Sequence, residues 1–139
     1  MSYLLDTCVV SEMVSRHPNR QVLAWLDSIA ETRLYLSVIT IGEIRKGIEK
    51  LPNSQRRTEI EDWLRDQLLP RFRERLVLVD ADVMLRWGEL VGGLEKQGKA
   101  IPAMDSLIAA SALHAGLSLV TRNVSDFLDT GVDMVSPWR

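Results

Sequence analysis

The chain has 139 residues, of which 46% are hydrophobic and 26% are charged, so its composition is that of one globular domain rather than a disordered segment. The formal net charge of −2 excludes a polycation that binds nucleic acid over its whole surface. The single cysteine, Cys8, excludes an intramolecular disulfide and a thiolate zinc site. No apolar run is long enough for a membrane helix, and we expect a cytoplasmic protein.

The first half of the chain alternates predicted strands with predicted helices. In chain order these are a strand at Tyr3–Leu5, a helix at Cys8–Ser15 capped by Asp6 or Thr7, an amphipathic helix after Asn19, a strand at Leu34–Ser37, and helices at Val38–Leu51 and Ser54–Leu69. The last two helices are expected to form a hairpin, which Pro70 helps to end.

The second half continues the alternation. Its predicted elements are a strand at Leu76–Val79, a helix at Ala81–Gln97, a helix that begins at Pro102 and ends at Gly116, a strand at Leu117–Thr121 and an edge strand at Met134–Ser136. The unbroken apolar run Leu76–Val79 indicates a strand covered on both faces. The whole pattern predicts an α/β fold, one domain over residues 1–139, with a mostly parallel central sheet of four to five strands and helices on both faces.

Two acids in the first half have both a functional and a structural interpretation. Asp6 follows the first strand, and ligands bind beyond the carboxyl ends of strands in open parallel sheets, but Asp6 can equally cap a helix. Glu43 lies off the apolar stripe of its helix, beside Thr40 and Gly47, whose small side chains leave room for a ligand. The alternative for Glu43 is a surface ion pair with Lys46 at i+3.

Two further acids lie in the second half. Asp105 belongs to a helix of apolar and small residues with no cation at i+3 or i+4, and an ionised carboxylate buried without a partner is costly. Its alternative is first-turn placement on the helix dipole, which contributes about 0.3–1 kcal/mol. Asp126 lies just past the fourth strand and can be a loop acid or a cap, whereas Asn123 is closer to the strand end and can serve as a neutral ligand there.

Together these residues place four acids near the carboxyl edge of one sheet, where their charges repel unless a cation neutralises them. Mg²⁺ prefers oxygen ligands and needs only a few carboxylates. Such an ion can activate water for cleavage of a phosphodiester. No Ser-His-Asp set is evident, and His17 and His114 are interpreted as structural or solvated.

The chain resembles the PIN-domain family and, within it, the VapC-like toxins of type II toxin–antitoxin pairs, including the FitB-like branch. The matching stretches are Leu4–Thr7, Ser37–Gly47, Ile101–Ala110, Val120–Phe127 and Ser136–Trp138. The resemblance implies a Mg²⁺- or Mn²⁺-dependent ribonuclease. It assigns the metal to Asp6, Glu43 and Asp105, and the fourth acid to Asp126 in one branch, while other members have an acid at Asn123.

The resemblance also implies supporting residues and partners. Thr7 matches the position that supports the first Asp, Thr121 and Asn123 are expected to support the site, and Cys8 stands where the family often has Asn. The expected partners are RNA, with tRNA as one candidate, and a cognate VapB-like antitoxin that occludes the site and carries operator-DNA binding. A homodimer that forms a heterotetramer or larger complex with the antitoxin is expected, and no membrane. The hairpin of residues 38–69 is the expected antitoxin and dimer surface, with Trp63 and the nearby Arg56 and Arg57 as candidate anchors.

Two alternatives of other classes remain. A receiver-like signalling module has a similar length and an acidic Mg²⁺ site, with Asp80 as the phosphate acceptor. That class has paired acids after its first strand and a Lys after its last core strand, but Asp6 has no acidic neighbour and Thr121-Arg122-Asn123 contains no Lys. The second alternative is a catalytically silent PIN-fold interaction domain.

Overall fold

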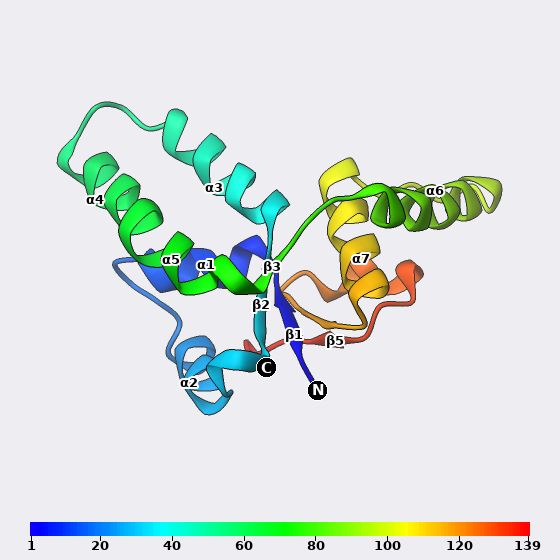
Figure 1. Ribbon diagram of the computed structural model, residues 1–139, viewed down its shortest axis with the longest axis horizontal. Helices are drawn as coiled ribbons and strands as arrows, with labels where there is room; N and C mark the ends of the chain where they lie inside the picture. Colours follow the sequence, from blue (N-terminus) through cyan, green and yellow to red (C-terminus); the bar gives the residue numbers. More distant parts are fainter.

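Five short strands form one parallel sheet, and the computed structural model describes all 139 residues (Figure 1). The strands are β1 (Tyr3–Leu5), β2 (Leu34–Ser37), β3 (Leu76–Val77), β4 (Ser118–Val120) and β5 (Met134–Val135). Their order is β3-β2-β1-β4-β5, and every neighbouring pair is parallel. The predicted parallel sheet is confirmed, and all of its carboxyl ends lie at one edge.

Seven α-helices connect and cover the strands. They are α1 (Thr7–Val14), α2 (Arg20–Ser28), α3 (Val38–Glu49), α4 (Gln55–Trp63), α5 (Leu69–Phe72), α6 (Ala81–Lys96) and α7 (Ala103–Ala115). Short turns of other helix types are η1 (Glu31–Arg33), the π-helical η2 (Leu64–Leu68), η3 (Arg73–Arg75) and η4 (Val124–Thr130). No helix is both long enough and apolar enough to cross a lipid bilayer.

The sheet carries a separate hydrophobic core on each face, because side chains alternate along each strand. In β1, Tyr3 and Leu5 belong to the larger core, which α1, α2 and the segment from α3 to α5 complete. Leu4 faces the other way, into a core completed by α7 and η4. The prediction of helices on both faces is therefore confirmed.

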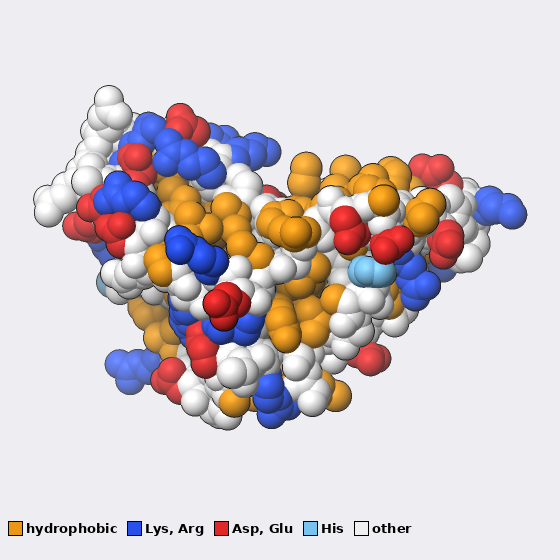
Figure 2. All heavy atoms as spheres, viewed as in Figure 1, with side chains coloured by type: hydrophobic (Ala, Val, Ile, Leu, Met, Phe, Trp, Pro, Cys, Tyr) orange, Lys and Arg blue, Asp and Glu red, His pale blue; other side chains and the backbone are white.

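Two helical arms lie on either side of a hollow above the carboxyl edge of the sheet (Figures 1 and 2). In one arm α3 and α4 form the predicted hairpin, tied by Arg57, which bonds to Glu61 at 3.1 Å and to Glu49 at 3.4 Å. In the other arm Trp87 of α6 donates to the hydroxyl of Ser106 of α7 at 2.8 Å. Figure 2 shows hydrophobic side chains gathered between the arms.

The helix predicted to end near Pro70 instead continues through the π turn η2 and α5 to Phe72. Proline in a helix clashes with the carbonyl four residues earlier and cannot donate to it. The π turn widens the helix immediately before Pro70, and Leu69 donates to the carbonyl of Leu64. The wider turn lets the chain continue and buries Leu68 and Phe72.

The predicted strand over Leu76–Val79 is confirmed only for Leu76 and Val77, and the prediction that it is covered on both faces is wrong. Only Leu76 and Val77 pair, because the single neighbour, β2, ends at Ser37 opposite Val77. β3 is an edge strand whose residues are half-buried, and Leu78 just beyond it is 60% exposed. A smaller difference is that Pro102 precedes α7 instead of occupying its first turn.

Candidate active site

Asp6 lies at the point where the chain connections of the sheet change direction. β1 is followed in sequence by β2 on one side, whereas β4 arrives on its other side, and crevices at such switch points bind ligands in open α/β sheets. Asp6 is buried, with 5% of the residue exposed. Its Oδ1 accepts from the Thr7 amide at 2.8 Å, and its Oδ2 accepts from the Thr121 hydroxyl at 2.8 Å. Asp6 is therefore a helix cap and a buried acid of the crevice at the same time.

Glu43 reaches the same edge from α3 by way of Thr7. The Thr7 hydroxyl lies 2.6 Å from Glu43 Oε1 and 3.2 Å from Thr40 Oγ1. A carboxylate can only accept, so the Thr7 proton is directed at Glu43. The alternative of a surface ion pair between Glu43 and Lys46 is not realised, whereas the neighbouring Arg45 pairs with Glu49 and Glu61.

Asp105 lies half-buried in the first turn of α7 and makes no hydrogen bond or ion pair. Burial raises the pKa of Asp105, and the charges of Asp6, Asp126 and Glu43 raise it further. The three other acids thus act on Asp105 through space although they come from three different elements. The sequence places a carboxylate in a helix with no cation nearby, and the fold surrounds it with more negative charge.

The turn after β4 brings the remaining residues to this edge. Thr121 is fully buried, donates to Asp6 and accepts from the Asn123 amide at 3.0 Å. Asn123 and Asp126 are exposed, and the Asp126 amide donates to the Asn123 carbonyl at 3.0 Å as η4 begins. Thr121 therefore connects the buried carboxylate of Asp6 to the loop that carries Asn123 and Asp126.

The side chain of Cys8 also contacts the site. Its sulfur lies 3.7 Å from Asp6 Oδ2 and accepts from the Arg122 amide at 3.4 Å. Burial raises the pKa of the thiol, and the charge of Asp6 raises it further. Cys8 is therefore a neutral neighbour of the carboxylate.

The four acids face one edge, but no three of their oxygens lie within 4.8 Å of one another. A different group does have three ligand atoms within 4.8 Å of one another. It consists of Asp80, Asp82 and His114, all exposed where α6 begins and α7 ends. Asp80 is occupied as the cap of α6, since its Oδ1 accepts from the Val83 amide at 2.9 Å. The expectation that His114 is solvated agrees with its exposure, but its closeness to two acids was not predicted.

Two cations lie at the rim of the site, and the sequence alone assigned neither of them to it, since Lys46 was considered only as a surface partner of Glu43. Arg122 follows Thr121, pairs with Glu12 at 3.6 Å, and lies over the ring of Trp138 at 4.9 Å. Lys46 lies one turn after Glu43 and forms no ion pair, whereas Arg45 beside it pairs with Glu49 and Glu61. Both cations could have been recognised from their positions in the sequence, because Arg122 follows a strand end and Lys46 lies three residues after a candidate acid.

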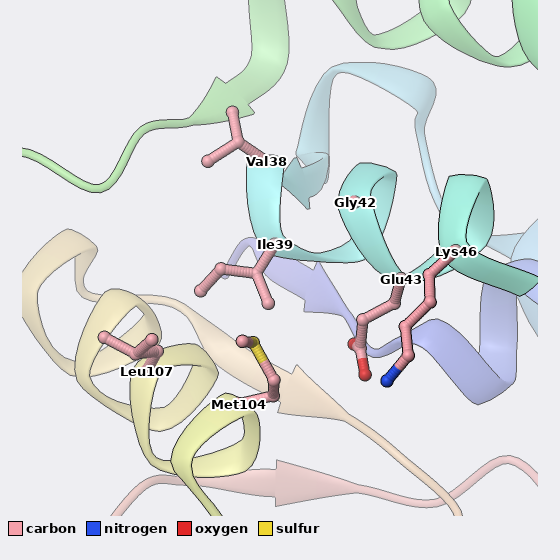
Figure 3. A pocket seen from close by; sticks show the side chains of 7 residues that line it. All are labelled: Val38, Ile39, Gly42, Glu43, Lys46, Met104 and Leu107. Carbon is pink, nitrogen blue, oxygen red and sulfur yellow. The ribbon is translucent and has the colours of Figure 1, made fainter.

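A pocket of about 460 Å³ opens beside Glu43, between α3 and α7 (Figure 3). The residues that line it are Val38, Ile39, Gly42, Glu43, Lys46, Met104 and Leu107. Most of its wall is aliphatic, while the carboxylate and the ammonium group lie together at one end. The acid site is thus continuous with an apolar recess.

Known proteins are similar to this chain in fold and in sequence over nearly its whole length. The PIN domain family model matches residues 3–131. VapC ribonuclease Y4jK of Sinorhizobium fredii is 37% identical, with 98% of this chain and 97% of the relative aligned. Toxin FitB of Neisseria gonorrhoeae is 36% identical, with 98% of each chain aligned. A structure of FitAB bound to the IR36 DNA fragment matches with a TM-score of 0.92 and 34% identity, covering 99% of this chain and 96% of that one.

The family match covers the four acidic positions and each element that carries them. It does not favour the receiver-like alternative, for which Asp80 was the expected acceptor. The fold, the parallel sheet and the similarity to VapC and FitB over almost the full length agree with one another. This chain belongs to the PIN-domain family, with toxins of the VapC and FitB type among its relatives.

Proposed function

We propose that this chain is a metal-dependent endoribonuclease and the toxin of a type II toxin–antitoxin pair. The observation that carries the proposal is Asp105, a half-buried carboxylate without a partner, whose pKa is raised by burial and further by the charges of three acids from other elements. Such a cluster is unfavourable unless it binds a cation. The relatives named as a VapC ribonuclease and a FitB toxin support RNA as the substrate and toxicity as the outcome.

The donor set fits Mg²⁺ or Mn²⁺. The proposed ligands Asp6, Glu43, Asp105 and Asp126 offer only carboxylate oxygens, which hard divalent cations prefer. Mg²⁺ keeps several waters and needs one or two direct carboxylates, so the separation of the four groups is compatible with it. When bound, the ion supplies positive charge that polarises a phosphate and a water molecule.

The chain's own residues have distinct roles in this proposal. Thr121 and the Thr7 amide fix the orientation of Asp6, and the Thr7 hydroxyl holds Glu43. Asp105 would hold the ion together with Asp6 and Glu43. A carboxylate of the cluster that the ion does not bind directly would take the proton that water loses as its oxygen bonds to phosphorus, and the leaving oxygen of the RNA would take a proton from solvent as its P–O bond breaks. Lys46 and Arg122 at the rim hold phosphates, so activity weakens as salt rises.

The proposed partners are a VapB-like antitoxin that covers the site, a second copy of the chain, and operator DNA through the antitoxin. The complex of FitAB with a DNA fragment supports this assembly. In the hairpin of residues 38–69, Trp63 packs on the core, and Arg56 and Arg57 bond to carbonyls of their own chain at Val14 and Leu51. These side chains are less free to anchor a partner than their sequence positions suggest.

Cleavage of total RNA with Mg²⁺, with Mn²⁺ and with chelator tests the proposal. Wild-type protein should produce discrete fragments only with metal, and Asp6→Asn and Asp105→Asn should abolish them. Asp82→Asn is the matched control, because Asp82 is also an acid in the first turn of a helix but lies outside the site. Folded protein that cuts no RNA with either metal would favour the silent interaction domain, and cleavage that survives both site substitutions would mark a contaminant.

A further inference from the structure

The pocket between α3 and α7 has chemistry that the four acids do not explain. An RNA phosphate needs only the cation and basic side chains, yet this recess of about 460 Å³ is walled mainly by aliphatic groups. Its volume lies within the range of about 300–1,000 Å³ for pockets that take small organic groups. The recess is therefore large enough for a planar ring system. A phosphate would make no favourable contact with its aliphatic walls.

The pocket is physically continuous with the acid site. Glu43 lines the pocket and also bonds to Thr7 beside Asp6. Met104 forms part of the opposite wall and directly precedes Asp105 on α7. A nucleotide whose base is seated in the pocket could therefore place its phosphate at the acids.

We propose that this pocket holds one unpaired nucleobase of the RNA, next to the bond that is cut, and so contributes to target selection. The inference rests on the proposed ribonuclease function. The faces of the base would lie against Val38, Ile39 and Leu107, and the flexible side chain of Met104, a residue that is 51% exposed, can close over its edge. Figure 3 shows Met104 and Leu107 on the α7 side of the recess, facing Ile39 of α3.

The polar end of the pocket suits the rest of the nucleotide. Lys46 lies beside the Glu43 carboxylate at the mouth of the pocket and forms no ion pair, so its ammonium group can bind an adjoining phosphate. Bases in single-stranded RNA are unstacked and free to enter such a recess, whereas those in a duplex are not. The charge and the apolar wall together favour a nucleotide over an uncharged ligand or a bare anion.

Gly42 permits a substitution that fills the pocket without touching an acid. A Cβ at this position meets no atom within 4 Å, and leucine has a higher helix propensity than the glycine that it would replace in α3. Gly42→Leu should therefore fold, occupy the recess and leave Glu43 in place. Met104→Ala removes one wall, and Met84→Ala is its matched control, because Met84 is 40% exposed in the first turn of α6 and lines no pocket.

The probe is a short fluorescent single-stranded RNA that wild-type protein cuts at one bond, made also with one base at a time deleted to leave an abasic sugar. Binding is measured by anisotropy in the inactive Asp105→Asn background, and kcat/KM in the active protein. Deleting one base beside the cut should weaken binding roughly tenfold, as expected for loss of a seated base. Gly42→Leu should weaken the binding of intact RNA to the same degree. When Gly42→Leu is combined with the RNA that lacks the base, the two losses of affinity should not add.

The outcomes separate the pocket from the catalytic proposal. If intact RNA is cut, and every abasic RNA binds equally well or the two losses add in full, the base pocket is refuted while the nuclease stands. If Gly42→Leu changes only the affinity for the antitoxin, the recess serves a protein partner and the proposal is equally refuted. If wild-type protein cuts no RNA, both proposals fail together. Met84→Ala should leave binding and cleavage at wild-type values.

Discussion

The hydrogen bond between Thr121 and Asp6 gives the sharpest prediction about how the site is held. Thr121→Val keeps the shape of a fully buried side chain but removes the hydroxyl that donates to Asp6 Oδ2 at 2.8 Å and accepts from the Asn123 amide at 3.0 Å. A hydrogen bond to a charged group is worth about 1.5–3 kcal/mol, and Asp6 has little exposure with which to recruit water instead. We expect the free energy of unfolding to fall by about 2 kcal/mol.

Thr130→Val is the matched control. Thr130 is 6% exposed, and its hydroxyl donates to the neutral carbonyl of Phe127 at 2.6 Å. Loss of a neutral hydrogen bond costs about 0.5–1.5 kcal/mol, so the control should destabilise less. It should also leave RNA cleavage intact, whereas Thr121→Val should reduce kcat because Asp6 loses its fixed orientation.

Urea unfolding at neutral pH without divalent metal measures both variants, with equal slopes required for the comparison. The double variant with Asp6→Asn should show that the loss at Thr121 depends on the carboxylate. Equal destabilisation by the two Val substitutions, or full additivity with Asp6→Asn, would refute the reasoning that Thr121 stabilises a buried charge.

Three further predictions follow from the same contacts. Because burial and neighbouring acids raise the pKa of Asp105, the folded state holds its proton to higher pH than the unfolded state. The free energy of unfolding of the wild type therefore falls as pH rises above about 3.9. Asp105→Asn cannot titrate at this position, so without metal its urea midpoint should be higher than that of the wild type at pH 7 but not at pH 3. Asp126→Asn should lower cleavage more than Asn123→Ala, and the reverse order in kcat/KM would assign the fourth ligand to Asn123. Gly116→Ala should lower the free energy of unfolding by about 1 kcal/mol because φ is +68° there. Gly47→Ala in α3 should raise it by up to about 1 kcal/mol. Shifts of the thermal unfolding midpoint in the same direction for both variants would contradict this reasoning.

Local patterns were sufficient to predict most of the fold. Asn19, Ser54 and Asp80 each accept from an amide of the helix that they precede, and Gly98 and Gly116 end α6 and α7 with positive φ. These signals act within a few residues, so they can be recognised in a sequence. The predicted length of β3 was wrong because an apolar run does not show how far the neighbouring strand β2 extends.

The acids were found individually, but their relations required the fold. Asp6 was left between a cap and a site residue, and the structure shows that these roles do not exclude each other, because its two oxygens have different partners. The contact of Thr7 with Glu43 joins residues 36 positions apart, and no spacing rule reports it. Continuation of the helix through Pro70 likewise depends on a π turn that local propensity does not anticipate.

Binding of Mn²⁺, followed by electron paramagnetic resonance, tests most directly whether the four acids hold a cation. Wild-type protein and Asp82→Asn should bind Mn²⁺ equally, whereas Asp6→Asn and Asp105→Asn should bind it at least tenfold more weakly. The comparison separates the proposed site from the exposed group of Asp80, Asp82 and His114, which has closer ligand atoms. Mn²⁺ binding that survives Asp6→Asn and Asp105→Asn but is lost in Asp82→Asn would contradict a cation site at the carboxyl edge of the sheet.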